Sequence, residues 1–444
     1  MRWFDIYMLC APVASTFKIA RVGALGARFQ CALCAFVLTL FVTLLKRQQS
    51  GNDGGYAGTE YARHAHMAAK VSSTVRARWS FKFLDVAHTS FTFAVGRKPH
   101  VLVTGGAGFI GSHCIMRLLE RGYAVTSVDN FSRGNIGAIR ALKAIAPVGS
   151  FRAIFGDLGY PHEIDAAFKF TNLKVDIVFH FAAIAYVGES TADPLRYYSN
   201  ITSNTIHVLK AMQQHKVNNL IYSSTCATYG NVELLPITES TPTNPINPYG
   251  RSKLYAENAI RDYAFSNPKF QATILRYFNV FGGDPKGRIG ELPRAALREH
   301  GRISGACFDV ALGITANLTI IGTKHPTRDG TTIRDFVHVI DLVDAHIAVA
   351  EKKKFGNPPL LYNVGTGRGV SMTEFVEACK RVTGKEIRIS SQPELRPGDY
   401  AEVYANVDKI QQELEWTARY TDLETSLMHA WEFRKMYGQE WNRM

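Results

Sequence analysis

The sequence predicts an α/β fold in which a doubly wound parallel sheet is joined to a smaller C-terminal lobe. Two observations predict it. From residue 100 to about residue 282, short apolar runs alternate with helical patterns, as in sheets whose parallel strands are connected by helices. The first run leads into three glycines with two residues between them, Gly105, Gly108 and Gly111, and a helical pattern follows. This order is typical of a Rossmann dinucleotide-binding domain.

Each expected strand is a short apolar run, and the regular alternation stops near residue 282. Beyond that point the loops are rich in glycine and proline and carry scattered arginines, so we expect the smaller lobe to begin there. A helix is expected within it at residues 373–383. The elements expected before it are a helix at residues 112–121 and strands at residues 101–104, 125–128, 151–155, 177–181, 220–224 and 272–275.

The glycines and the acidic residue after the second strand predict which dinucleotide is bound. Gly105 permits a tight turn, Gly108 lets the backbone approach a diphosphate, and Gly111 lets the helix pack close to the strand. Asp129 follows Gly111 by 18 residues, where a carboxylate binds the adenosine ribose and repels a 2′-phosphate. NAD is therefore favoured over NADP. Arg133 keeps NADP as an alternative cofactor, because an arginine can accommodate that phosphate.

Two further segments predict acid–base chemistry at the same edge of the sheet. The fifth strand delivers hydroxyl groups, with Thr225 at its end, to the carboxyl edge where ligands bind in open α/β sheets. Tyr249 and Lys253 follow a proline, and their spacing of four puts them on one face of a helix. A lysine ammonium beside a phenol favours the phenolate, so Tyr249 is predicted to act as a general base near neutral pH.

These residues resemble the extended short-chain dehydrogenase/reductase family, and within it the UDP-sugar 4-epimerases. The resemblance covers residues 100 to about 435 and is strongest to the plant UDP-arabinose (UDP-xylose) 4-epimerases. It implies an isomerase that inverts C4 of UDP-xylose or UDP-L-arabinopyranose through a 4-keto intermediate, with NAD bound. UDP-glucose/UDP-galactose interconversion is the alternative. The stretches that carry the resemblance are residues 180–183, 187–190, 197–200, 224–230, 275–279, 297–308, 333–335, 363–367 and 396–399.

The resemblance also implies a role for each matching residue. Thr225 would bind the sugar O4, Tyr249 would remove its proton, and Lys253 would hold the nicotinamide ribose. Residues 99–282 would form the NAD-binding domain, and residues 283–436 mainly the nucleotide-sugar-binding lobe. Lys253 and the following residues would line NAD: Gly105, Gly108, Phe109, Ile110, Asp129, Asn130, Asp157, Leu158, Phe181, Ala182, Asn200 and Tyr277. The UDP-sugar would contact Asn279, Arg302, Arg334, Arg396 and Asp399.

The chain departs from the family pattern at two positions. Bacterial galactose epimerases carry a lysine where this chain has Ala185. Because that lysine contacts cofactor phosphate in the family, we expect retention of NAD to differ here. Arg251 replaces a more usual lysine between the two residues of the tyrosine–lysine pair, which is a mild change.

Two rival functions are left open. A nucleotide-sugar 4,6-dehydratase or a decarboxylase shares the fold, but dehydratases place Asp-Glu after the catalytic threonine, and here Cys226-Ala227 follow Thr225. A non-catalytic NAD-binding protein belongs to another class. It has no need of Thr225, Tyr249 and Lys253 together, so their presence opposes this reading.

The net charge of +13 is concentrated in the N-terminal arm. Residues 1–98 hold 13 Lys and Arg against 4 Asp and Glu. This concentration favours a targeting or membrane-flanking segment over a nucleic-acid groove, and we expect no nucleic-acid partner. The seven cysteines show no spacing that indicates a disulfide framework, and only Cys31 and Cys34 are spaced like metal ligands. That pair lies in an apolar run without a second pair, so we expect no metal.

An uncharged, mostly apolar run occupies residues 29–45 and lies at the short limit for a membrane-spanning helix. We predict a signal anchor, preceded by a basic tail at residues 1–28 and followed by a stem at residues 46–98. A cleaved signal peptide, a transit peptide and a buried core helix are the alternatives. The family resemblance implies a single-pass type II Golgi membrane protein with a lumenal catalytic domain, acting as a homodimer. A cytosolic location is the alternative.

Overall fold

A computed structural model describes most of the chain beyond its N-terminal arm. The predicted basic tail, anchor and nearly all of the stem lie outside the described residues, and so does Arg396. Among the helices that are described, none is long and apolar enough to cross a membrane. The described residues are 98–170, 173–293, 297, 301–395 and 398–438.

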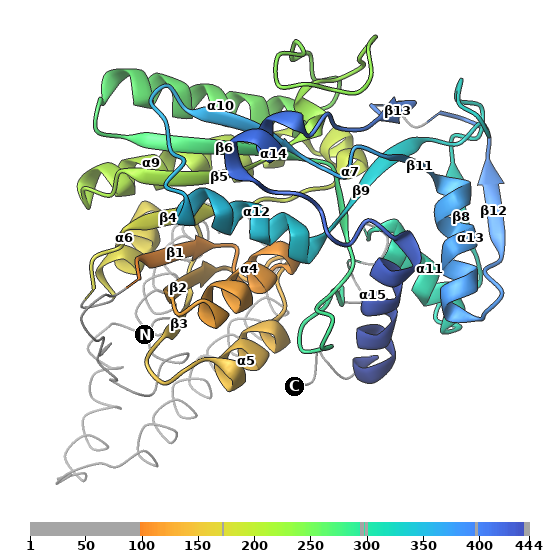
Figure 1. Cartoon of the computed structure of the whole chain (residues 1–444), viewed down its shortest axis with the longest axis horizontal. Coiled ribbons are helices and arrows are strands. Elements are labelled where there is room, and N and C mark those ends of the chain that lie inside the picture. The colour runs from red at the N-terminus through yellow and green to blue at the C-terminus, as the bar shows by residue number, and fades with distance from the viewer. Residues whose placement is uncertain (1–97, 171–172, 294–296, 298–300, 396–397, 439–444) are drawn as a thin grey trace, which may run out of the picture. The chain divides into compact units, whose positions relative to one another are not determined.

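A seven-stranded sheet forms the centre of the described structure (Figure 1). The strand order is β10-β6-β5-β4-β1-β2-β3, so the chain runs from β1 to one edge and then returns to build the other half. Every neighbouring pair is parallel, which confirms the predicted doubly wound fold. The strands are β1 (His100–Thr104), β2 (Ala124–Asp129), β3 (Phe151–Phe155), β4 (Ile177–His180), β5 (Asn219–Thr225), β6 (Gln271–Tyr277) and β10 (Leu360–Val364).

Helices cover both faces of this sheet, which explains why its strands are apolar almost throughout. Val101 and Val103 of β1 join one buried cluster, whereas Leu102 between them joins a second cluster on the opposite face. The longer helices that contribute to the first cluster are α4 (Phe109–Glu120), α5 (Ile136–Ile145) and α12 (Val339–Glu351), and those of the second are α6 (Pro161–Lys169), α9 (Asn204–Gln214) and α10 (Pro248–Ser266).

The six strands predicted from the sequence are all present, and their bounds differ from the prediction by no more than two residues at either end. The large sheet does not end near residue 282, where the alternation of strands and helices stops in the sequence. β10 pairs with β6, and α12 packs against α4, although both elements follow that boundary. A long insertion separates them from the rest of the sheet, so the alternation of strands and helices is broken in the sequence but not in space.

The smaller lobe has a mixed sheet in which β11, β7 and β13 all pair with β9. Its core contains Phe281, Phe336, Phe375 and Trp431. The predicted helix is α13, which begins with a capping box closed by Ser371. The elements are β7 (Asn279–Phe281), α11 (Ile303–Ala311), β8 (Leu318–Ile321), β9 (Ile333–His338), β11 (Gly369–Ser371), α13 (Met372–Thr383), β12 (Ile389–Gln392), β13 (Glu402–Val403) and α15 (Leu423–Tyr437).

The remaining short elements lie in connections between strands of the large sheet, except for α14 near the C-terminus. A chain of short helices follows β4 and leads into α9, a 3₁₀ turn follows β5, and one helix packs against β10. They are α7 (Val187–Ala192), α8 (Pro194–Tyr197), the π-helix η1 (Tyr198–Ser203), the 3₁₀ turn η2 (Cys226–Thr228) and α14 (Asp408–Leu414).

Candidate active site

A cavity of about 990 Å³ lies at the carboxyl edge of the parallel sheet. Its lining includes residues at or just beyond the ends of β1, β2, β4, β5 and β6, where ligands bind in folds of this kind. Residues of the smaller lobe line it as well. All the described residues that the sequence predicted to be catalytic or ligand-binding are among its lining: Gly105, Gly108, Phe109, Ile110, Asp129, Asn130, Asp157, Leu158, Phe181, Ala182, Asn200, Thr225, Tyr249, Lys253, Tyr277, Asn279, Arg302, Arg334 and Asp399.

The glycine turn after β1 is packed too tightly for side chains. Gly105 has a φ of 73°, and a Cβ there would lie 2.8 Å from the backbone of Ala182. A Cβ on Gly111 would lie 2.2 Å from the carbonyl oxygen of Gly105. Gly108 is the N-cap of α4, and its N–H donates to that same carbonyl at 3.1 Å. The first turn of α4 thus presents its N–H groups to the cavity, which fits a diphosphate.

Asp129 at the end of β2 is held against this turn. Its carboxylate accepts hydrogen bonds from the N–H groups of Ala107 at 2.9 Å and Phe131 at 2.7 Å. A carboxylate oxygen can accept more than one hydrogen bond, which suits a site for ribose hydroxyls. Beside it, the Asn130 amide donates to the Asp157 carboxylate at 2.9 Å and so links the tips of β2 and β3. This polar group fits the adenosine end of a dinucleotide.

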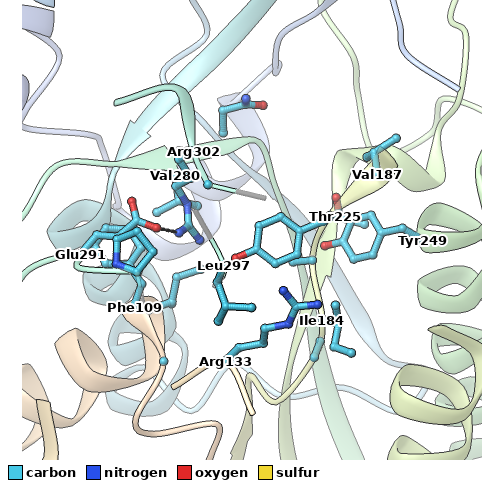
Figure 2. A pocket seen from close by; sticks show the side chains of 18 of the residues that line it. Phe109, Arg133, Ile184, Val187, Thr225, Tyr249, Val280, Glu291, Leu297 and Arg302 are labelled. Atoms are coloured by element: carbon cyan, nitrogen blue, oxygen red, sulfur yellow. Dashed lines mark hydrogen bonds and ion pairs between the residues drawn. The ribbon is translucent and has the colours of Figure 1, made fainter. Parts of the chain in front are cut away.

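Thr225 and Tyr249 lie together on one side of the cavity (Figure 2). Thr225 ends β5, and its hydroxyl accepts a hydrogen bond from the N–H of Ala227, which fixes the side chain at the strand tip. Asn247 caps the start of α10 and places Tyr249 in the first turn of that helix. Thr225 is close enough to Tyr249 to lower the pKa of its phenol. The strand and the helix therefore bring two hydroxyl groups to one point.

Lys253 is one turn farther along α10 and is 2% exposed. Its ammonium nitrogen donates to the carbonyl oxygen of Ser223 at 2.6 Å and lies 4.9 Å from the centre of the Tyr222 ring. Burial lowers the pKa of Lys253 to about 7, against the opposing effect of Glu257. Whether Lys253 is charged near neutral pH therefore depends on what occupies the cavity.

The predicted ionisation of Tyr249 needs a correction. We expected the ammonium of Lys253 to lower the pKa of this phenol toward neutral. Burial instead raises the pKa of Tyr249 to about 12, although Thr225 acts in the opposite direction. Desolvation outweighs the neighbouring charges, because a buried phenolate loses its hydration. Spacing along a helix predicted the neighbours but not how deeply the hydroxyl is enclosed.

Arg302 faces this pair from the smaller lobe. It is the N-cap of α11 and forms an ion pair with Glu291, and its guanidinium carbon lies 4.7 Å from the centre of the Phe109 ring. Figure 2 shows Phe109, Glu291 and Arg302 grouped on the side of the cavity opposite Thr225 and Tyr249. Glu291 was not predicted from the sequence, because nothing in its neighbourhood marks it as different from a surface carboxylate.

Arg334 and Asp399 form a second ion pair at the cavity wall. Arg334 is buried in β9, and its guanidinium also donates to the carbonyl oxygens of Tyr400 at 2.7 Å and Ile333 at 2.8 Å. Asn279 begins β7 nearby and lines the same cavity. The structure therefore brings together the described residues predicted to hold a UDP-sugar.

Arg133 was the residue that kept NADP as an alternative cofactor, and the structure shows which groups its side chain contacts. It pairs with Glu189 of α7, and its guanidinium carbon lies 4.9 Å from the centre of the Tyr186 ring. It thus points across the cavity toward the segment after β4. Glu189 was not predicted to line the cavity, although it lies in one of the stretches that carry the family resemblance.

Nothing in the described part of the chain assembles a metal site from three or more His, Cys, Asp or Glu side chains. The four cysteines described there are free thiols. The described lining therefore offers its ligands N–H groups, hydroxyls, carboxylates and guanidinium groups.

Comparison with known proteins gives this cavity a family. Residues 101–365 match the model of the NAD dependent epimerase/dehydratase family. The chain belongs to this family. NAD, predicted from the glycine turn and Asp129, is therefore confirmed as its cofactor. The residues described above fit that cofactor, because the turn leaves room for a diphosphate and Asp129 stands where the ribose hydroxyls are bound.

Within the epimerase/dehydratase family, the chain is similar to proteins named as UDP-sugar epimerases, which confirms the predicted resemblance. UDP-arabinose 4-epimerase 1 of Arabidopsis thaliana is 55% identical over 76% of this chain and 80% of its own length. UDP-glucose 4-epimerase 3 of Oryza sativa subsp. japonica is 40% identical over 78% of this chain and 93% of its own. The crystal structure of UDP-glucose 4-epimerase from Bifidobacterium longum, in complex with NAD⁺ and UDP, matches with a TM-score of 0.72 and 36% identity. It covers 77% of this chain and 99% of its own.

Proposed function

We propose that this protein is a UDP-sugar 4-epimerase that uses NAD to interconvert UDP-xylose and UDP-L-arabinopyranose. The observation that carries the proposal is that Thr225, Tyr249 and Lys253 line one cavity together with the glycine turn after β1. The 55% identity to a UDP-arabinose 4-epimerase supports the choice of a pentose.

Tyr249 is the proposed acid and base of the reaction. As a phenolate it takes the proton from O4 of the sugar while C4 gives up its hydride, and the sugar becomes a 4-keto compound. NAD⁺, when bound, supplies the hydride acceptor and a positive charge that favours the phenolate. The 4-keto sugar then turns about its link to the diphosphate, the hydride returns to the other face, and Tyr249 returns the proton to O4. No net oxidation occurs.

Thr225 and Lys253 prepare this proton transfer. Thr225 and Tyr249 line the cavity together, so the threonine hydroxyl is placed to orient the sugar O4 toward the phenol. Lys253 lies on the same face of α10 and provides an ammonium beside the nicotinamide ribose. A water-poor cavity strengthens both interactions, because charges attract more strongly where the dielectric constant is low.

The UDP-sugar is assigned to Asn279, Arg302, Arg334 and Asp399, together with Arg396. Guanidinium groups match the geometry of diphosphate oxygens. Arg302 is paired with Glu291 in the described structure, so we expect the substrate diphosphate to compete with that carboxylate. Arg334 donates to the carboxylate of Asp399 and to the carbonyl oxygens of Tyr400 and Ala401, so we infer that its main task is to hold the segment that carries Asp399.

The substrate proposal is tested by assaying four sugars in parallel: UDP-xylose, UDP-arabinopyranose, UDP-glucose and UDP-galactose. We expect the pentose pair to turn over faster, with some activity on the hexoses. The 40% identity to a UDP-glucose 4-epimerase makes the hexose pair the second candidate. Inert pentoses beside active hexoses would overturn the pentose assignment. A hexose product that has lost water would indicate a dehydratase, because epimerisation conserves every atom. A decarboxylase would leave all four sugars unchanged, since none of them carries a carboxylate.

We further propose that the apolar run at residues 29–45 anchors the chain in the Golgi membrane, with a lumenal catalytic domain that forms a homodimer. Basic residues flank the run on both sides, as at the ends of a spanning helix. In the lumen the exposed Asn317 of an Asn-Leu-Thr sequon would be glycosylated, whereas Asn200 in the cavity wall would not. Carbonate extraction and protease protection on microsomes test the topology. A chain that washes off, or is digested in intact vesicles, contradicts it.

A further inference from the structure

We propose that the guanidinium of Arg133 binds the diphosphate of NAD, and that it is the cation this chain uses to retain the cofactor. The inference rests on the NAD dependence of the family and adds a residue to which the resemblance gives no role. Arg133 lines the cavity from the loop after β2. Its Nη2 is paired with Glu189, but its Nε and Nη1 are buried without hydrogen-bond partners.

The loop that carries Arg133 is tied to the glycine turn. Asp129 accepts from the N–H of Ala107, and the N–H of Asn135 donates to the carbonyl oxygen of Ala107 at 2.9 Å. Between them, Gly134 packs so closely that a Cβ there would lie 2.7 Å from Ala107 Cβ. Because this turn carries the diphosphate in dinucleotide-binding domains, the backbone of Arg133 is held at a fixed place beside it.

The other cations described at the cavity wall already have acceptors. Lys253 donates to Ser223, Arg302 to Glu291, and Arg334 to Asp399 and backbone oxygens. Within the described residues, the buried donors that line the cavity and lack any partner both belong to Arg133. Buried charged donors without acceptors are unfavourable, and phosphate oxygens are the acceptors that guanidinium groups bind best.

The direction of the side chain favours the diphosphate over a 2′-phosphate on the adenosine ribose. Arg133 extends away from the tip of β2 and across the cavity toward Ile184 (Figure 2). Its guanidinium stacks on the ring of Tyr186 in the segment after β4. That segment carries no cation of its own between Phe181 and Gly188. Arg133 therefore supplies positive charge to a part of the wall that has none.

Glu189 allows the guanidinium to change partners. Besides Arg133, it accepts hydrogen bonds from Arg196 at 2.8 Å and from the hydroxyl of Tyr197 at 3.0 Å. When Arg133 turns toward a phosphate, this carboxylate keeps two donors and is not left buried alone. Arg196 is also a matched control, since it binds the same carboxylate but does not line the cavity.

The test compares Arg133→Gln, Arg133→Lys and Arg196→Gln in the full chain. Affinity is measured by titration with NAD, NADP, ADP-ribose and adenosine, and retained NAD is counted in the purified proteins. We expect Arg133→Gln to weaken NAD and ADP-ribose about tenfold or more, to leave adenosine unchanged and to flatten the salt dependence of NAD binding. Arg133→Lys should recover part of the loss, because it restores the charge without the planar fork. Arg196→Gln should bind NAD within about twofold of the parent.

Several results would overturn the proposal. Unchanged NAD affinity in Arg133→Gln would do so, and equal losses in Arg133→Gln and Arg196→Gln would assign the effect to the fold around Glu189. If only the affinity for NADP fell, Arg133 would bind the 2′-phosphate instead. If only the affinity for UDP fell, measured at saturating NAD, Arg133 would bind the substrate. A parent that binds no NAD would overturn the proposed function together with this inference. Thermal unfolding without ligand checks that all three variants fold.

Discussion

The ammonium nitrogen of Lys253 lies 2.6 Å from the carbonyl oxygen of Ser223. This bond fastens the first turns of α10 to β5 two residues before Thr225, the last residue of that strand. This contact helps to hold α10, with Tyr249 in its first turn, beside the end of the strand that carries Thr225. Lys253 thus holds α10 to β5 in addition to its proposed chemical role, and different measurements test the two roles.

The first prediction concerns the pH dependence of stability. Burial lowers the pKa of Lys253 to about 7 in the folded protein, from an ordinary value of 10.5. Between these values the unfolded chain binds a proton that the folded one does not, so the free energy of unfolding rises with pH by up to ~1.4 kcal/mol per unit. Lys253→Met removes this rise. Denaturant unfolding of both proteins between pH 7 and 10 measures the difference, and parallel curves would contradict the burial of an uncharged lysine.

Tyr249→Phe is expected to lower kcat by ~10²–10⁴, the usual effect of losing a positioned acid or base. NAD affinity should change little, because the ring remains in place. Tyr255→Phe is the matched control, since this tyrosine lies on the same helix but is 49% exposed and does not line the cavity. Initial rates with UDP-xylose and titration with NAD measure both effects. Near-parental turnover in a folded Tyr249→Phe protein would remove Tyr249 from the mechanism.

Asp129→Asn should reduce the preference for NAD over NADP by about tenfold, because the repulsion of a 2′-phosphate depends on the negative charge. The asparagine oxygen can still accept one of the two N–H bonds that Asp129 accepts from Ala107 and Phe131, so the loop should keep its course. Dissociation constants for both dinucleotides test this. If the variant discriminates as sharply as the parent, another group reads the ribose.

The sequence predicted the strands that consist of local apolar runs, and it predicted the lining residues that belong to recognisable spacings. It could not predict β10, because pairing with β6 joins segments that are more than eighty residues apart. Glu189 and Glu291, the partners of Arg133 and Arg302, were missed because the charge of a carboxylate alone does not distinguish it from a solvated surface residue. Asp399 was implied by the family resemblance, but its ion pair with Arg334 joins residues 65 positions apart and could not be predicted.

The pKa of Tyr249 is another property that the sequence could not predict. Its neighbours were predicted correctly, since helical spacing fixes Lys253 and strand order fixes Thr225. The sign of the shift depends on burial, which the whole fold determines. Local pattern is therefore a better guide to which groups meet than to how those groups ionise.

The last prediction concerns the buried ion pair that supports α10 one turn beyond Lys253. Glu257 is fully buried and accepts from Arg276 at 2.6 and 2.9 Å and from Ser224 at 2.5 Å. Arg276→Met should destabilise the fold by about 3–5 kcal/mol, because it leaves the carboxylate buried without its main partner. Arg261 also binds Glu257, but its side chain is 36% exposed, so Arg261→Ala should cost less than ~1 kcal/mol. Denaturant unfolding of the two variants gives the comparison. Equal losses would mean that water reaches Glu257, and that its pairing with Arg276 contributes little to the position of α10.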